Sequence, residues 1–238
     1  MKSIILYVVF LVISINGFSN QKTNVYLFHG QGSDYRIFSK LKLDSNLFDT
    51  TFIVYPKMER RVSLNKYAKL IIPQINTSQN YVFIGVSFGG MLVSELSAYM
   101  SPQKSIIISS AQNKNEIPSR YKFMKVIPIH KLVPAFMYKA GARIAQPIFE
   151  PDRKNEKEIF KAMLNDKKAY FFKGVTKMMI DWDNYEFNEN IIHIHGANDH
   201  TLPIKKVKAN YSIEKGSHMM LLTRADEINQ LINFILTN

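Results

Sequence analysis

The stretch Gly85-Val86-Ser87-Phe88-Gly89 decides how the rest of the chain is interpreted. It follows the apolar run 81–84 and precedes a helical pattern over 91–96. A serine in a tight strand-to-helix turn, with glycines two residues before and after it, holds its oxygen exposed beside the N-terminus of the helix. The alternative is an ordinary glycine-rich turn, so the interpretation depends on the other loops of the chain.

One such loop, His29-Gly30-Gln31-Gly32, comes directly after the apolar run 25–28. Two glycines allow the backbone to turn over the serine. The backbone N–H groups of Gln31 and Phe88 would then form an oxyanion hole. A plain turn is the alternative for this segment.

Two later loops carry an acid and a histidine. Asp199 follows the apolar run 191–194, where a carboxylate is well placed to accept a hydrogen bond from an imidazole, although an Asx turn is the alternative. His218 lies in Gly216-Ser217-His218, just before the last helical pattern, and the alternative is a loop histidine without a special role.

With Ser87, Asp199 and His218 in this order, the chain resembles the α/β-hydrolase superfamily. The resemblance extends from about residue 25 to the C-terminus and identifies no subfamily. It implies a trimmed, mostly parallel sheet of about six strands flanked by helices, with an inserted helical cap. A serine at position 87 argues against the dehalogenase branch, which uses an aspartate.

The resemblance also implies the role of each residue. His218 takes the proton of Ser87 and later returns it to the leaving group, while Asp199 orients the imidazole. Asp181 and Asp183 are the fallback candidates for the acid. The catalytic residues expected are thus Ser87, Asp199 and His218, with no cofactor.

The other histidines receive structural interpretations. His193 and His195 alternate with isoleucines and should share one face of a strand, and the alternative for His195 is a turn position at the strand end. His29 is expected to shape the oxyanion loop, His130 to pack or lie on the surface, and His200 to diverge from its neighbour Asp199. Because these histidines are scattered and the chain has no cysteine, we expect no metal site.

The expected organisation is a signal peptide, a core and a cap. Lys2, the apolar run 4–15 and the small residues Gly17 and Ser19 predict a cleaved signal peptide over 1–19, with an uncleaved anchor as the alternative. Export would place the protein in the periplasm or outside the cell. The core comprises 20–111 and 183–238, and the cap 112–182.

Apolar runs and helical periodicity locate the elements of the core. Strands are expected at 25–28, 51–55, 81–85, 105–109, 191–195 and 208–213. Helices are expected at 35–41, 63–75, 90–100 and 224–236.

The cap is expected to be helical. An apolar stripe at helical spacing predicts one amphipathic helix, which Pro128 and Pro134 shorten or kink. The stripe consists of Ile129, Leu132, Val133, Phe136 and Met137. A second helix is expected over 156–168. Residues 178–182 could close the pocket, although apolar stripes of this kind most simply attach a cap to its core.

Charge supplies a clue about partners. The net charge is +12, and residues 112–181 hold 15 Lys/Arg against 7 Asp/Glu. A basic amphipathic cap suits an anionic membrane surface or acidic substrates, although a solvated basic surface is the simpler interpretation. Nucleic-acid binding has no motif to support it, and a monomer is the default.

We therefore expect a secreted serine hydrolase of a small carboxylic ester or thioester with an apolar acyl group. Peptidase, carbon–carbon hydrolase and acyltransferase chemistry use the same residues and stay open. A ligand-binding protein of the same fold and a membrane-surface lipase are the alternatives.

Overall fold

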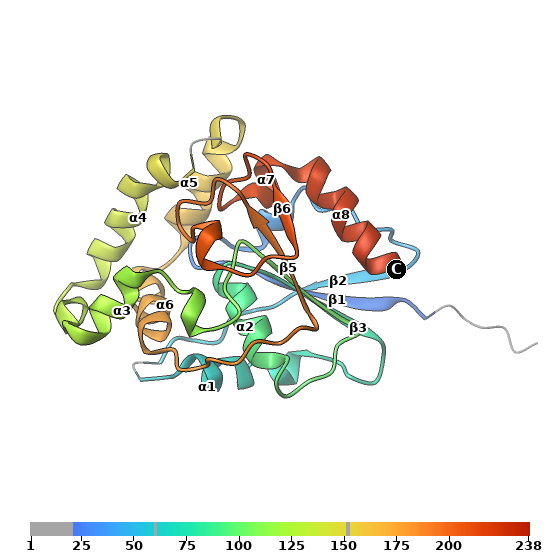
Figure 1. Ribbon diagram of the computed structural model, residues 1–238, viewed down its shortest axis with the longest axis horizontal. Helices are drawn as coiled ribbons and strands as arrows, with labels where there is room; N and C mark the ends of the chain where they lie inside the picture. The colour runs from blue at the N-terminus through green and yellow to red at the C-terminus, as the bar shows by residue number, and fades with distance from the viewer. Residues whose placement is uncertain (1–20, 60, 151–152) are drawn as a thin grey trace, which may run out of the picture.

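A computed structural model describes residues 21–59, 61–150 and 153–238, so the predicted signal peptide 1–19 lies outside the described residues. Within these ranges, six parallel strands form one sheet in the order β2-β1-β3-β4-β5-β6 (Figure 1). The strands are β1 (Thr23–Phe28), β2 (Phe48–Phe52), β3 (Tyr81–Val86), β4 (Lys104–Ile108), β5 (Ile191–Gly196) and β6 (Tyr211–Ile213). The expected six-stranded parallel sheet is confirmed.

The central strands follow the apolar runs, whereas the edge strands depart from expectation. All six residues of β3 are buried, as expected for a strand covered on both faces. In β2, at one edge, only Phe48 is buried, and the strand begins three residues before the predicted 51–55. β6, at the other edge, covers only the last half of the predicted 208–213. An edge strand has one neighbour, so apolar content alone locates it poorly.

Helices cover both faces of the sheet. One apolar core joins the sheet to α1 (Leu64–Lys69), α2 (Phe88–Leu96) and α6 (Ala169–Asp181). The other core joins the opposite face to α7 (Met220–Thr223), α8 (Ala225–Thr237) and α5 (Lys157–Asp166). Figure 1 shows α1 and α2 below the sheet and α8 above it.

Two predicted helices of the core are much shorter than expected, and the helix predicted at 90–100 is observed as α2, which ends at Leu96. The segment 35–41 forms only the 3₁₀ turn η1 (Tyr35–Phe38). The segment 63–75 divides into α1 and the 3₁₀ turn η2 (Ile72–Gln74), which contains Pro73. Proline has no N–H to continue the helical ladder, which explains the division.

The long connection between β4 and β5 is helical, as expected for the cap. It contains α3 (Ser119–Val126), α4 (Ala135–Phe149), α5 and α6, together with the 3₁₀ turns η3 (Lys114–Glu116), η4 (Pro128–Lys131) and η5 (Arg153–Glu156). A last 3₁₀ turn, η6 (Ile204–Lys206), follows β5. In Figure 1, α3 and α4 lie at the margin of the molecule opposite α8. The boundaries of the cap at 112 and 182 stay a prediction.

The expected apolar helix over 129–137 is wrong. η4 ends at Lys131 and α4 begins at Ala135, with Pro134 in the N-cap position. Proline favours the first positions of a helix, so each of the two prolines begins an element instead of kinking one. The apolar side chains do not attach the cap to the core, because Leu132 and Phe136 are largely exposed. No helix among the described residues has the length and hydropathy to span a membrane.

Candidate active site

Ser87 lies in the turn between β3 and α2, in a backbone conformation that side chains rarely adopt. Its φ is 53° and its ψ −119°. The flanking glycines are required by space, because a Cβ on Gly89 would lie 2.1 Å from the Phe28 carbonyl oxygen. A Cβ on Gly85 would lie 2.6 Å from the carbonyl oxygen of Gly89. The Ser110 hydroxyl donates a 2.6 Å hydrogen bond to the Ser87 carbonyl oxygen and supports the strained turn.

The structure brings Ser87, His218 and Asp199 together. His218 Nε2 lies 2.8 Å from Ser87 Oγ, and His218 Nδ1 lies 2.7 Å from Asp199 Oδ2. With the proton on Nδ1, the imidazole donates to the carboxylate and its Nε2 accepts from the serine hydroxyl. Ser87 follows β3 and Asp199 follows β5, so both stand at the carboxyl edge of the sheet.

The pair of His218 and Asp199 favours the charged form of each partner. Burial lowers the pKa of the His218 imidazole, but the charge of Asp199, its hydrogen bond and the charge of Glu150 together raise this pKa above its ordinary value. Burial opposes ionisation of Asp199, yet His218 holds the pKa of this carboxyl below its usual range. Asp199 Oδ1 also accepts 2.8 Å hydrogen bonds from the N–H groups of Thr201 and Leu202, which fix the carboxylate plane.

The loop after β1 passes next to the serine. A Cβ added to Gly30 would lie 3.2 Å from the Cβ of Ser87, so a larger residue would press against the serine. Among the described residues we find no acceptor for the Gln31 N–H. The Phe88 N–H lies in the first turn of α2, where N–H groups have no partner within the helix. Two donors are therefore free where the sequence predicts an oxyanion hole.

Side-chain contacts to the cap hold this loop. Gln31 Nε2 donates to the Phe172 carbonyl oxygen at 2.8 Å and to Thr176 Oγ1 at 3.0 Å, both in α6. His29 Nδ1 lies 2.8 Å from the Gly30 carbonyl oxygen, so the ring donates there and its Nε2 accepts from Lys167 Nζ at 3.3 Å. Burial and the charge of Lys167 lower the pKa of His29 to about 3 and keep it neutral.

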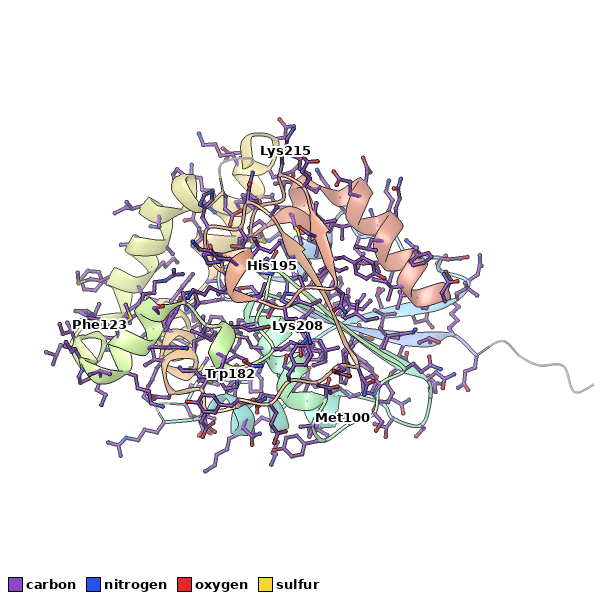
Figure 2. All side chains as sticks on the ribbon, viewed as in Figure 1. Met100, Phe123, Trp182, His195, Lys208 and Lys215 are labelled. Carbon is purple, nitrogen blue, oxygen red and sulfur yellow. The ribbon has the colours of Figure 1, made fainter. Side chains whose placement is uncertain are left out.

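A cavity of about 290 Å³ opens above Ser87 and His218. The core contributes its floor, and α3, α4, α5 and α6 contribute its walls. Its apolar or small lining residues include Val86, Gly141, Ala142, Ala145, Leu164, Phe172, Met179 and Leu202. Of the residues 178–182 expected to close the pocket, Met179 lines it. Trp182, labelled in Figure 2, is buried in the core. Its indole N–H donates a hydrogen bond to Glu95.

Glu150, at the end of α4, is a member of the site that the sequence does not indicate. Its Oε2 accepts hydrogen bonds from Ser217 Oγ at 2.8 Å and from the Met219 N–H at 3.1 Å, on both sides of His218. Burial raises the pKa of Glu150 to about 7, and the charge of His218 opposes this rise. Glu150 lies 67 residues before Ser217, in a segment without a motif, so no local pattern reveals it.

Two buried histidines lie behind Asp199. His195, labelled in Figure 2, belongs to β5 and not to a turn. It shares one face of the strand with His193, as predicted, and the two ring centroids lie 4.9 Å apart. His195 Nε2 donates to the Leu202 carbonyl oxygen at 2.7 Å and lies 3.4 Å from Asp199 Oδ2. His195 Nδ1 then accepts from His193 Nε2 at 3.0 Å. This chain supports the loop that carries the acid.

The remaining candidates lie outside this cluster. His130 is buried in the cap and His200 is exposed. Asp181 pairs with Lys177, so this fallback acid has another partner. Among the described residues, no group of three or more His, Cys, Asp or Glu side chains is placed to hold a metal ion.

Comparison with known proteins gives the fold a name. No family model matches the chain, and no curated protein matches it in sequence. Solved structures do match. A lipase-esterase related protein from Clostridium acetobutylicum is 15% identical, with a TM-score of 0.64, covering 90% of this chain and 94% of the other. The enol-lactonase from Burkholderia xenovorans is 13% identical, with a TM-score of 0.67 and coverages of 91% and 92%.

An esterase from Exiguobacterium antarcticum is similar to the same extent, with 13% identity, a TM-score of 0.65 and coverages of 91% and 92%. At such identities the likeness concerns the fold and not the reaction. The parallel sheet, the strained serine turn after β3 and the near-complete coverage agree with one another. The chain has the α/β-hydrolase fold.

Proposed function

We propose that this protein is a serine hydrolase that cleaves a carboxylic ester through an acyl-enzyme on Ser87. The observation that carries the proposal is the continuous hydrogen-bonded chain from Ser87 Oγ through His218 to Asp199. A serine hydroxyl needs an adjacent base at neutral pH, and this geometry supplies one. The esterases and the enol-lactonase of the same fold support ester chemistry by analogy.

The proposed reaction has two halves. Ser87 Oγ attacks the ester carbonyl carbon while His218 Nε2 takes the hydroxyl proton, and the N–H groups of Gln31 and Phe88 receive the developing oxyanion. His218 then gives the proton to the departing alcohol. In the second half a water molecule attacks the acyl-enzyme, His218 takes its proton, and the acid leaves as Ser87 recovers the hydrogen.

The cavity supports a small substrate with an apolar acyl group. Its volume of about 290 Å³ is near the lower end for small-molecule sites, which begin at about 300 Å³. Leu164, Phe172 and Met179 offer an apolar wall, while Ser87 and the oxyanion loop offer the polar contacts. An oxygen ester is our first choice, and a thioester fits the same geometry.

Export is part of the proposal and depends on the sequence alone. The apolar run 4–15 after Lys2 supports a signal peptide, and we propose that the protein acts outside the cytoplasm. Mass spectrometry of the protein from a secreting host would test this. We expect a mature N-terminus near residue 20, and retention of Met1 would contradict cleavage.

A fluorophosphonate probe tests the reaction most directly. Wild-type protein should be labelled and Ser87→Ala should not, while Ser39→Ala, at an exposed serine, should be labelled like the wild type. Hydrolysis of p-nitrophenyl esters of increasing acyl length would then measure the pocket, with short chains preferred. Folded wild-type protein that takes no label and cleaves none of these esters would favour a ligand-binding role instead.

A further inference from the structure

The outward surface of α3, η4 and α4 is unusually apolar. The exposed fraction is 84% for Leu132, 79% for Val126 and 76% for Ile144. Five more large apolar side chains of this segment are exposed: Phe123, Ile127, Ile129, Phe136 and Met137. We call these eight residues the outer apolar face. Soluble monomers rarely gather so many large exposed apolar side chains, and such a patch marks an interaction site.

The spacing of these residues shows that the helices turn an apolar side outward. Phe123, Val126 and Ile127 follow one another at i, i+3 and i+4, and Phe136 and Ile144 lie two turns apart on α4. Figure 2 shows Phe123 at the outer margin of the molecule, and Figure 1 places α3 and α4 along that margin. The inner sides of the same helices line the cavity above Ser87, through Tyr121 and Ala145 among others.

The charge of this segment has one sign. From residue 117 to residue 149 the sequence contains six Lys/Arg and no Asp/Glu. Arg120, Lys139 and Arg143 donate to Thr201 or Asn165 and so hold the segment in place. Exposed Lys122, Lys125 and Lys131 extend from the same elements, and their ammonium groups have no hydrogen-bond or ion-pair partner among the described residues.

The charge decides which partner fits the outer apolar face. A second copy of this chain would bring two such faces together, and the lysines of the two copies would repel each other. An anionic lipid bilayer offers apolar chains for the eight side chains and phosphates for the lysines, which is the combination that binds interfacial amphipathic helices.

We propose that the outer apolar face binds the surface of an anionic lipid bilayer. If the proposed function is right, the bound enzyme then takes its ester from the lipid phase, because α3 and α4 separate that face from the cavity. The substrate class would be a membrane-resident ester that presents a short acyl group to the cavity between these helices. This second step depends on the proposed function, whereas the binding does not.

Vesicle binding tests the proposal with the full chain. The vesicles are phosphatidylcholine alone and phosphatidylcholine with phosphatidylglycerol, each at low and at high salt. We expect wild-type protein and Ser87→Ala to bind the anionic vesicles equally, more weakly at high salt, and to bind the neutral vesicles poorly. Lys122→Gln/Lys125→Gln should weaken the anionic binding by about 25-fold, at about fivefold for each lysine.

Matched variants separate this face from the rest of the chain. Phe136→Ser/Ile144→Ser should weaken binding, whereas Phe234→Ser, at an exposed phenylalanine of α8, and Lys205→Gln/Lys206→Gln should not. Every variant has the same amino terminus, so the differences in binding belong to the substituted residues. Circular dichroism melts should show that all variants fold.

Each outcome of these experiments either supports or contradicts the proposal. Equal binding to both vesicle types, binding to neither, or equal loss with the control variants overturns the proposal. A wild-type dimer that Phe136→Ser/Ile144→Ser dissociates, seen by sedimentation equilibrium, would assign the face to self-association and also overturn it. Binding without esterase activity would leave this proposal standing and remove the proposed function, and the reverse result would do the opposite.

Discussion

The two carboxylate oxygens of Asp199 have different hydrogen-bond partners. Oδ1 accepts the N–H groups of Thr201 and Leu202, which leaves Oδ2 for the Nδ1–H of His218. An asparagine here would keep its carbonyl oxygen toward the two backbone donors, so its amide NH₂ would face the imidazole. The ring would then have to carry its proton on Nε2, where it cannot accept the proton of Ser87.

Asp199→Asn should therefore lower kcat by about 10⁴ while the protein stays folded, the size seen when this tautomer is lost in serine proteases. Steady-state kinetics on a p-nitrophenyl ester and a thermal melt would measure both quantities. Near-normal turnover with an unchanged melt would show that another group supports the histidine.

Glu150 should set the pH at which the base becomes available. His218 must be neutral to accept a proton, and the negative charge of Glu150 helps to raise its pKa. Glu150→Gln removes this charge, lowers the pKa of His218 and moves the acidic limb of kcat/KM to lower pH. We expect a shift of about 0.5 pH unit, which corresponds to about 0.7 kcal/mol of interaction.

Ser217→Ala is the control for this pH profile, because it removes a hydrogen-bond partner of Glu150 and keeps the charge. Its limb should stay close to that of the wild type even if its rate falls. The two groups titrate together, so the limb describes the pair. An unmoved limb in Glu150→Gln would limit Glu150 to a structural role.

At the scale of elements, the serine turn depends on close contact between α2 and the loop after β1. A Cβ at Gly89 meets backbone oxygens of Phe28 and His29, at 2.1 and 2.7 Å, and neither can move without disturbing β1. Gly89→Ala should therefore lower the free energy of unfolding by more than about 3 kcal/mol, the upper range for overpacking. Urea denaturation followed by tryptophan fluorescence would measure it.

Gly141→Ala is the matched substitution in α4, where nothing lies within 4 Å of the added Cβ. It should raise the free energy of unfolding by about 0.5–1 kcal/mol, because alanine favours the helix over glycine. Similar effects at Gly89 and Gly141 would contradict the steric account of the turn.

These elements also show what the sequence could reveal. Ser87 and Asp199 follow buried parallel strands. Such strands can be recognised from their apolar runs, and their carboxyl ends lie at the same edge of the sheet. His218 could be placed by its order in the chain. Glu150 could not be placed from the sequence, because it belongs to an inserted helical segment in which no strand pattern indicates its position. The expectation that the stripe over 129–137 packs on the core is wrong for a related reason: helical spacing shows that a stripe exists, but not whether it faces the core or a partner.

At the scale of the whole molecule, two groups of contacts hold the cap differently. α5 and α6 are fastened to the core through the ion pair of Arg36 with Asp166 and through the hydrogen bonds that Gln31 donates to α6. α3 and α4 contact the core at the rim of the cavity, through the hydrogen bond of Arg120 to Thr201 and through Glu150, which accepts from Ser217 and Met219. The half formed by α5 and α6 fixes the oxyanion loop, and the half formed by α3 and α4 carries the outer apolar face.

The core behind the site should make the stability of the molecule depend on pH. Burial lowers the pKa of His193 to about 3, with the neighbouring His195 as a smaller cause. In the unfolded chain His193 titrates near 6.5, so it contributes stability in full above that pH and loses it as the pH falls toward 3. Burial lowers the pKa of His195 as well, whereas Glu150 and His218, with raised pKa values, act in the opposite sense. The pH dependence of the wild-type free energy of unfolding therefore combines opposing contributions. A substitution of one of these groups isolates its contribution.

His193→Gln keeps a donor for His195 Nδ1 and removes the buried proton acceptor. Between about pH 6 and pH 4, its free energy of unfolding should fall less steeply than that of the wild type, by about 1.4 kcal/mol per pH unit, the contribution of one proton. Urea unfolding at a series of pH values would measure both slopes, with His200→Gln as the control for losing an exposed imidazole. If the free energy of unfolding depends on pH equally in His193→Gln and in the wild type, His193 is protonated without unfolding of the core. Water would then reach the residues behind Asp199 more easily than their burial indicates.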